Sequence, residues 1–210
     1  MSNKQIDVLI LSAGKGTRIK KQFGDTPKVL IKHNGEIALN RVLFPFKNCV
    51  SSVPFRICLN IRKDEEQYFK DFGMSLFLED IPLGNAGAIK VFGEKLSDPF
   101  IVTHNDIDLK NINPLDLYMA HLQNDNFVTM TIHNMSKEKE YGIVVKKHNK
   151  VIGFTRERWV NCGFYCVSHK VFEVIEDGFQ DIDQHMLPRL SSIHQLSCYE
   201  YDGFYEDWGK

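Results

Sequence analysis

The first half of the chain alternates short apolar runs with segments whose apolar side chains recur at helical spacing. The apolar runs are 7–12 (DVLILS), 55–60 (FRICLN), 74–79 (MSLFLE) and 99–104 (PFIVTH), and helical spacing is found in 64–72, 85–96 and 114–123. Strands that alternate with helices are typical of a parallel sheet covered by helices on both faces. In 85–96, Ile89, Phe92 and Leu96 share one face, and Asn85 would cap the first turn.

The apolar runs of the second half lie closer together, which favours antiparallel strands. From about residue 126 they fall at 127–133, 141–145, 150–154 and 161–167. We therefore expect an α/β protein with a mostly parallel central sheet, helices on both faces and a smaller antiparallel addition in the second half. A length of 210 residues with no linker or internal repeat suits one domain over 1–210.

Composition excludes several broad classes of protein. A formal net charge of -1 argues against a protein that coats nucleic acid, and the 43% of hydrophobic residues suffices for a sizeable core. No apolar run approaches the length that spans a membrane, and the N-terminus lacks the apolar core of a signal peptide, so we expect a cytoplasmic protein with no membrane partner. The five cysteines lack metal-site spacing and are expected to be buried, reduced thiols: Cys49, Cys58, Cys162, Cys166 and Cys198.

A glycine-rich stretch, LSAGKGTR (11–18), directly follows the first apolar run. Glycine permits positive φ and lets backbone N–H groups approach phosphate oxygens, while Lys15 and Arg18 add positive charge. Arg18 could hold a di- or triphosphate through two parallel hydrogen bonds. The stretch is not GxGxxG, since Ile19 occupies the third glycine position, and it is not a Walker motif. The alternative is a plain turn with solvated cations.

A second polar stretch, TPKVL (26–30), also suits phosphate chemistry. Pro27 stiffens the approach to Lys28, and a buried run follows, so this lysine could hold a fixed charge against a reacting phosphate. Alone, it could equally be a solvated lysine.

Ligands of open α/β sheets gather at the carboxyl ends of the strands, so we expect the loops after 7–12, 74–79 and 99–104 to form one site.

Carboxylates follow the run 99–104 and recur near the C-terminus. Asp106 and Asp108 suit Mg²⁺, which prefers one or two carboxylates together with phosphate oxygens and water. Glu206 and Asp207 offer the second carboxylate of such a site. The alternative for the first pair is a role in a turn or a helix cap, and we assign no role to the neighbouring His104.

Eight motifs stand in the order and spacing of one enzyme family. They are LSAGKGTR (11–18), TPKVL (26–30), PLGNAGAI (82–89), THND (103–106), YGIVV (141–145), VIGFTRE (151–157), VNCGFY (160–165) and YEDWG (205–209). Through them the chain resembles sugar-1-phosphate nucleotidyltransferases over nearly its whole length. The resemblance implies a Rossmann-like nucleotidyltransferase domain, 1–210. It also implies transfer of a nucleoside monophosphate from an NTP to a small phosphorylated acceptor, with Mg²⁺ and release of pyrophosphate.

The same resemblance implies roles for individual residues. Lys28 would stabilise charge at the α-phosphate, Arg18 would contact the departing pyrophosphate, and Asp106 would act with them in catalysis. Asp106 and Asp207 would hold the metal. The residues implied to bind nucleotide are Leu11, Ala13, Gly14, Lys15, Gly16, Thr17, Arg18, Lys28, Glu79, Gly84, Asn85 and Asp106. Those implied to bind the acceptor are Gly142, Glu157, Arg158 and Asn161.

Base and acceptor are predicted from two positions. Glu79 stands where relatives read the nucleobase, and a carboxylate only accepts hydrogen bonds, which favours cytosine or guanine with their amino donors. We therefore favour CTP, then GTP, although Glu79 could be an exposed turn residue. The family's EKP segment reads Glu157-Arg158-Trp159 here, and Arg158 could bind phosphate bidentately.

The altered acceptor segment favours a non-sugar acceptor. The chain is similar to capsule-pathway cytidylyltransferases that activate phosphoglutamine, which would yield CDP-glutamine for a capsule or surface polysaccharide. The alternatives are a heptose-type sugar-1-phosphate guanylyltransferase and a non-catalytic nucleotide-binding regulatory module. An NAD-type oxidoreductase lacks its glycine fingerprint. The FPF and GFY segments would form either an interface in a homo-oligomer or part of the core.

Overall fold

The computed structural model describes residues 5–14, 24, 26–33, 35–49, 53–135, 143–147, 150–155 and 158–207. The strands are β1 (Ile6–Leu11), β2 (Lys32–His33), β3 (Glu36–Ile37), β4 (Phe55–Arg62), β5 (Ser75–Glu79), β6 (Phe100–His104), β7 (Ile107–Asp108), β8 (Val128–Asn134), β9 (Ile143–Lys147), β10 (Lys150–Thr155), β11 (Trp159–Val167), β12 (Leu196–Glu200) and β13 (Glu206–Asp207). The helices are α2 (Ala38–Asn48), α3 (Gly84–Gly93), α4 (Pro114–Asn124) and α5 (Leu187–Ser192), with the short turns η1 (Lys28–Leu30), η2 (Lys63–Tyr68), η4 (His169–Glu173) and η5 (Ile182–Met186).

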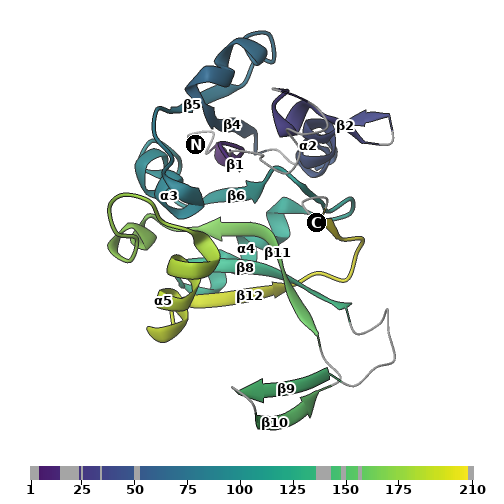
Figure 1. Ribbon diagram of the computed structural model, residues 1–210, viewed down its shortest axis with the longest axis vertical. Coiled ribbons are helices and arrows are strands. Elements are labelled where there is room, and N and C mark those ends of the chain that lie inside the picture. The colour runs from purple at the N-terminus through teal and green to yellow at the C-terminus, as the bar shows by residue number, and fades with distance from the viewer. Residues whose placement is uncertain are drawn as a thin grey trace.

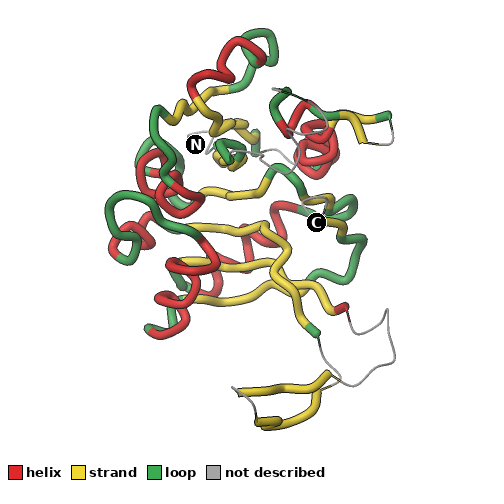
Figure 2. The backbone as a smooth tube through the Cα atoms, in the orientation of Figure 1, coloured by secondary structure: helices red, strands yellow, loops and turns green. Residues whose placement is uncertain are grey.

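A seven-stranded sheet in the order β12-β8-β11-β6-β1-β4-β5 forms the centre of the molecule (Figure 1; Figure 2). β6, β1, β4 and β5 run parallel to one another, and β12 runs parallel to β8, whereas β11 is antiparallel to both of its neighbours. The predicted mostly parallel α/β fold is therefore confirmed. The antiparallel addition differs in one respect. β8, β11 and β12 extend the central sheet, and the β9–β10 hairpin forms a separate antiparallel sheet at one end of the molecule (Figure 1).

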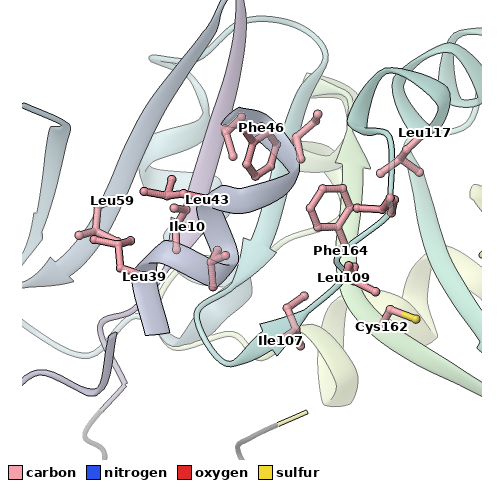
Figure 3. Packing of buried hydrophobic residues seen from close by; sticks show 14 of the residues in the cluster. Ile10, Leu39, Leu43, Phe46, Leu59, Ile107, Leu109, Leu117, Cys162 and Phe164 are labelled. Atoms are coloured by element: carbon pink, nitrogen blue, oxygen red, sulfur yellow. The ribbon is translucent and has the colours of Figure 1, made fainter. Parts of the chain in front are cut away.

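Helices cover both faces of this sheet because the side chains of β1 alternate between two cores. Val8 and Ile10 enter a core that includes side chains of α2 and α4, whereas Leu9 and Leu11 enter one that includes side chains of α3 and α5. Figure 3 shows the first of these cores, in which residues of α2 lie against those of the sheet. All six residues of β1 are buried, as expected for a strand covered on both faces.

Several elements depart from the sequence prediction. The segment 38–48 forms α2 even though Pro45 lies inside it, and the buried Pro45 packs with the rest of the helix face. The predicted helix over 64–72 forms the short turn η2 instead. α4 agrees with its prediction, since the side chain of Asn113 accepts a hydrogen bond from the backbone N–H of Leu115 and Pro114 occupies the first turn.

Three of the five cysteines behave as predicted. Cys58, Cys162 and Cys166 are buried free thiols, and burial raises the pKa of each. Cys49 is half-buried and Cys198 is exposed, which the prediction of five buried thiols missed.

The aromatic segments belong mainly to the core. Phe46, Phe164 and Tyr165 are buried, whereas Phe44 is 43% exposed. No helix in the described ranges is both long and apolar enough to cross a membrane.

The buried His121 predicts a decline in stability on the acid side of neutrality. Its Nδ1 lies 2.9 Å from Thr129 Oγ1, and burial lowers its pKa below 6.5. Below about pH 6.5 the unfolded chain binds a proton at this histidine that the folded chain does not bind. The free energy of unfolding therefore decreases as the pH is lowered, by at most about 1.4 kcal/mol per pH unit for one group. We expect His121→Asn to reduce this slope between pH 7 and 5.5 in urea unfolding.

The exposed His194, whose φ of 56° asparagine tolerates, provides the matched control. His194→Asn should leave the slope as in the wild type. Equal slopes in His121→Asn and the wild type would contradict the assignment.

Candidate nucleotide-binding site

A cavity of about 500 Å³ lies at the carboxyl ends of β1, β4 and β5. Its lining residues are Ala13, Gly14, Asn60, Glu79, Pro82, Gly84, Asn85, Phe179 and Asp181. A second cavity of about 530 Å³ shares Ala13, Glu79 and Pro82 with it and continues over 62–64 and 80–81. The loops after β1 and β5 meet there, as the strand-end rule predicted, whereas the loop after β6 is not among the residues that line these two cavities.

Half of the predicted nucleotide-binding set can be placed at this sheet edge. Leu11 is the last residue of β1, and Ala13, Gly14, Glu79, Gly84 and Asn85 line the cavity. Lys15, Gly16, Thr17 and Arg18 lie outside the described residues, so the phosphate cradle and the pyrophosphate contact of Arg18 stay predictions.

Hydrogen bonds fix the start of the glycine loop to its neighbouring strands. The backbone N–H of Ser12 donates to the carbonyl of Asn60 at 2.9 Å, and Asn105 Nδ2 donates to Ser12 Oγ at 2.8 Å. The Asn105 side chain thus joins the end of β6 to the end of β1. Asn60 is a buried polar residue that the sequence analysis did not single out, although it ends a predicted strand.

Glu79 is a buried carboxylate at the end of β5 and not an exposed turn residue. Its Oε2 accepts a hydrogen bond from the backbone N–H of Leu83 at 3.2 Å. Burial raises the pKa of Glu79, while the hydrogen bonds from Leu83 and the Asn60 side chain act in the opposite direction. The carboxylate therefore holds the turn 80–83 in place as well as lining both cavities.

Lys28 and Asp106 form an ion pair with 2.5 Å between Nζ and Oδ2. The two residues are 78 positions apart in the chain. Lys28 begins η1 directly after the buried Pro27, and the fully buried Val29 follows it, so its backbone is fixed. Both charged side chains are partly exposed, at 23% and 22%, and remain accessible to a ligand.

Asp207 is brought to the same region by the pairing of β13 with β7. In this pairing Asp207 lies opposite Ile107, the residue after Asp106. The charges of both aspartates raise the pKa of Tyr205, after the larger effect of burial, so both lie near that side chain. Burial lowers the pKa of His104, and four nearby carboxylates oppose this effect, those of Asp106, Asp183, Asp181 and Asp207.

Asp108, considered with Asp106 as a metal ligand in the sequence, does not join this group. It is 1% exposed, and its Oδ2 lies 3.9 Å from Arg41 Nη1 on α2. Burial raises the pKa of Asp108, and Lys110 and Arg41 oppose that shift. The side chain belongs to the interior and not to the cleft.

The predicted acceptor residues are only partly placed. The Asn161 side chain on β11 donates to Tyr165 Oη at 2.7 Å and to Asp183 Oδ1 at 3.2 Å, and its Oδ1 accepts from the backbone N–H of Gly163. Tyr205 Oη donates to the Asn161 carbonyl at 3.5 Å, which connects this cluster with the carboxylates. Arg158 is exposed just before β11, and Gly142 and Glu157 lie outside the described residues.

The glycines of LGNAGA allow a distant segment to pack against the start of α3. Gly84 has a φ of 71°, and a Cβ there would overlap the carbonyl oxygen of Gln180. That oxygen accepts hydrogen bonds from the backbone N–H groups of Ala86 and Gly87, at 2.9 and 3.2 Å. Asn85 therefore does not cap the helix as predicted, because a backbone carbonyl already satisfies the first free N–H groups.

This packing brings Phe179 and Asp181 into the cavity. Neither residue was singled out in the sequence, because the segment 174–186 shows neither a motif nor a clear period. A backbone carbonyl that caps a helix from across the fold leaves no signature in residue type, so only the LGNAGA glycines could have hinted at a close approach.

We expect Gly84→Ala to destabilise the protein more than an alanine at another glycine of positive φ. Gly178 (φ 88°) has open space around its Cβ position, so Gly178→Ala should cost only about 1–2 kcal/mol for the left-handed backbone. Gly84→Ala adds the overlap with Gln180 and should cost about 2–5 kcal/mol. Urea unfolding of both variants tests this. Equal losses would show that Gln180 moves away freely.

Comparisons with known proteins agree with this geometry. No family model matches the chain. It is 27% identical to a mannose-1-phosphate guanyltransferase of Aspergillus fumigatus and 26% identical to a mannose-1-phosphate guanylyltransferase catalytic subunit beta of Dictyostelium discoideum, in each case over 96% of this chain. The chain spans about 60% of the length of these relatives.

Solved structures show the same fold. The structure of HddC from Yersinia pseudotuberculosis complexed with GMP-PN matches with a TM-score of 0.71 at 22% identity, covering 98% of this chain and 95% of that one. An inositol-1-phosphate CTP transferase from T. maritima matches with a TM-score of 0.67 at 16% identity, covering 97% and 89%. The predicted resemblance to sugar-1-phosphate nucleotidyltransferases is thus confirmed, since the chain is similar to such enzymes in sequence over 96% of its length and shares the fold of the solved structures.

Proposed function

We propose that the chain transfers a nucleoside monophosphate from a nucleoside triphosphate to a sugar 1-phosphate or a similar small phosphorylated acceptor. An oxygen of the acceptor phosphate attacks the α-phosphorus, the bond between that phosphorus and the bridging oxygen breaks, and pyrophosphate leaves. The Lys28–Asp106 ion pair carries this proposal, because Asp106 follows β6, the strand next to β1, whose loop lines the cavity. Sequence similarity to mannose-1-phosphate guanyltransferases supports it.

Lys28 is suited to stabilise the transition state. Its ammonium group is fixed by η1 and by Asp106, so its positive charge is in position before the substrate binds. Preorganised charge of this kind stabilises developing negative charge on a phosphoryl group without reorganisation during the reaction. The loop 11–14 would bring the triphosphate to this charge, because it follows the strand next to β6.

The carboxylates Asp106 and Asp207 fit Mg²⁺. Within the described residues no group of three His, Cys, Asp or Glu side chains forms an all-protein metal site, whereas Mg²⁺ is commonly held by one or two carboxylates together with substrate phosphates and water. Asp106 and Asp207, which come from neighbouring strand ends, supply those oxygens. Bound there, Mg²⁺ would neutralise phosphate charge and orient the triphosphate.

GTP is the triphosphate that the relatives' names support. The Glu79 carboxylate suits either guanine or cytosine, since both bases have amino donors. The sequence alone favoured CTP. Two guanyltransferases at 26–27% identity move the preference to GTP with a sugar 1-phosphate.

CTP with a non-sugar acceptor such as phosphoglutamine, as a step toward a capsule precursor, is the second candidate. One observation favours it. Glu157-Arg158-Trp159 stands where the resembling enzymes have an EKP segment. The guanidinium group of Arg158 would bind the acceptor phosphate bidentately, through two hydrogen bonds.

Pyrophosphate release with Mg²⁺ tests the proposal, with four NTPs crossed against sugar 1-phosphates, phosphocholine and phosphoglutamine. We expect signal with GTP and a sugar 1-phosphate. A signal only with CTP and phosphoglutamine would establish the second candidate. If every pair is silent while NTPs raise the melting temperature, either the acceptor lies outside this panel or the chain is a non-catalytic binding module.

Lys28→Met and Asp106→Asn should each lower kcat by at least about a hundredfold, because each removes a charge at the reacting phosphate. Lys32→Met, which removes an exposed lysine four residues further along, is the matched control and should retain full activity. Full activity in Lys28→Met would overturn the proposed mechanism.

A further inference from the structure

The segment 174–180, here called the anchored loop, is held in place from the side of α3. Lys90 Nζ on α3 donates to the carbonyl of Ile175 at 2.7 Å and pairs with Asp177 Oδ1 at 2.6 Å. The Gln180 backbone N–H donates to the Leu83 carbonyl at 2.8 Å, in addition to the bonds that the Gln180 carbonyl accepts from α3. The loop is therefore joined to α3 at both of its ends.

Arg189 on α5 holds the same loop from the other side. Its Nη1 donates to the Gln180 Oε1 at 3.0 Å and to the carbonyl of Val174 at 3.4 Å, and its Nη2 lies 2.9 Å from Glu176 Oε1. Lys90 contacts the loop at two residues and Arg189 at three, so the backbone around Phe179 is fixed before any ligand arrives.

The anchored loop exposes one large apolar side chain. Phe179 is 59% exposed, whereas the next residue, Gln180, is 7% exposed. The ring lines the cavity that Gly14 and Glu79 also line. An aromatic side chain left in water on a fixed backbone, within a concave site, provides a flat apolar surface that a ligand can cover.

We propose that Phe179 packs against the nucleoside of the bound triphosphate, an inference that rests on the proposed function. The cavity that it lines extends from the end of β1 to the end of β5, which is the predicted nucleotide side. Asn161 and Asp183, on the predicted acceptor side, are not among the residues lining that cavity. A phenyl ring offers no hydrogen bond to a phosphate, but it stacks on a base or packs on a ribose.

Calorimetric titrations of GTP, of CTP and of inorganic tripolyphosphate, each with Mg²⁺, test this role. Phe179→Ala should weaken nucleotide binding about tenfold, similarly for each NTP that binds, since stacking tolerates any base. Binding of tripolyphosphate should stay as in the wild type. Phe179→Tyr, which keeps the ring, should restore nucleotide affinity.

Steady-state kinetics separates the nucleotide from the acceptor. Phe179→Ala should raise the KM for the NTP and leave the KM for the acceptor unchanged. A rise only in the acceptor KM, or an equal loss of tripolyphosphate binding, would overturn the assignment. Phe44→Ala, at a 43% exposed position on α2, is the control and should behave as the wild type.

The two proposals fail in different ways. If the wild type binds and turns over nucleotide but Phe179→Ala has unchanged affinity, only the role of Phe179 is wrong. If the wild type neither binds nor turns over any NTP, the proposed function fails and the role of Phe179 fails with it. Equal melting temperatures of the wild type and Phe179→Ala would show that a loss of binding does not arise from unfolding.

Discussion

The complete burial of β1 is the constraint on which the rest of the structure depends. Because its side chains enter two cores in turn, helices must cover both faces of the sheet, and the strand can only lie in its interior. The chain then leaves β1 at the carboxyl edge, between the ends of β4 and β6. The glycine loop thus begins at the carboxyl edge of the sheet, directly after a fully buried strand, which is where ligands of such sheets gather.

A second constraint joins the two halves of the chain at that edge. The Gln180 carbonyl caps α3, whose first turn belongs to the nucleotide side, while the same segment continues into η5 beside Asn161 and Asp183. This backbone contact, which two glycines make sterically possible, therefore helps to set the position of η5 and Asp183 relative to the start of α3. In the proposed in-line transfer both substrates must be aligned, so the contact would contribute to the chemistry without touching either substrate.

The sequence predicts those features that residue type encodes and misses those that backbone atoms create. Period and strand-end chemistry were enough to predict β1 and the meeting of the loops after β1 and β5. Lys28 and Asp106 were singled out separately, and their ion pair across 78 residues was not predicted. α2 escaped prediction because Pro45 lies within it, and the capping role of Asn85 was wrong because a carbonyl 95 positions away acts instead. Phe179 had no motif around it, so only its exposure on the anchored loop points to the role that we propose for it.

The residues proposed to act on the phosphate and those proposed to bind the nucleoside are held in place by different contacts. This difference suggests how nucleotide specificity varies within one fold. Lys28 begins η1 and Asp106 lies in the turn directly after β6, so the charges proposed to act on the phosphate are positioned by elements next to the core. Glu79 and Phe179 lie at a strand end and on a loop whose positions depend on surface ion pairs and on the turn 80–83. Under the proposed function, substitutions at the latter positions would change the nucleoside or its affinity and leave the phosphate chemistry unaltered, because the elements that carry Lys28 and Asp106 are held by other contacts.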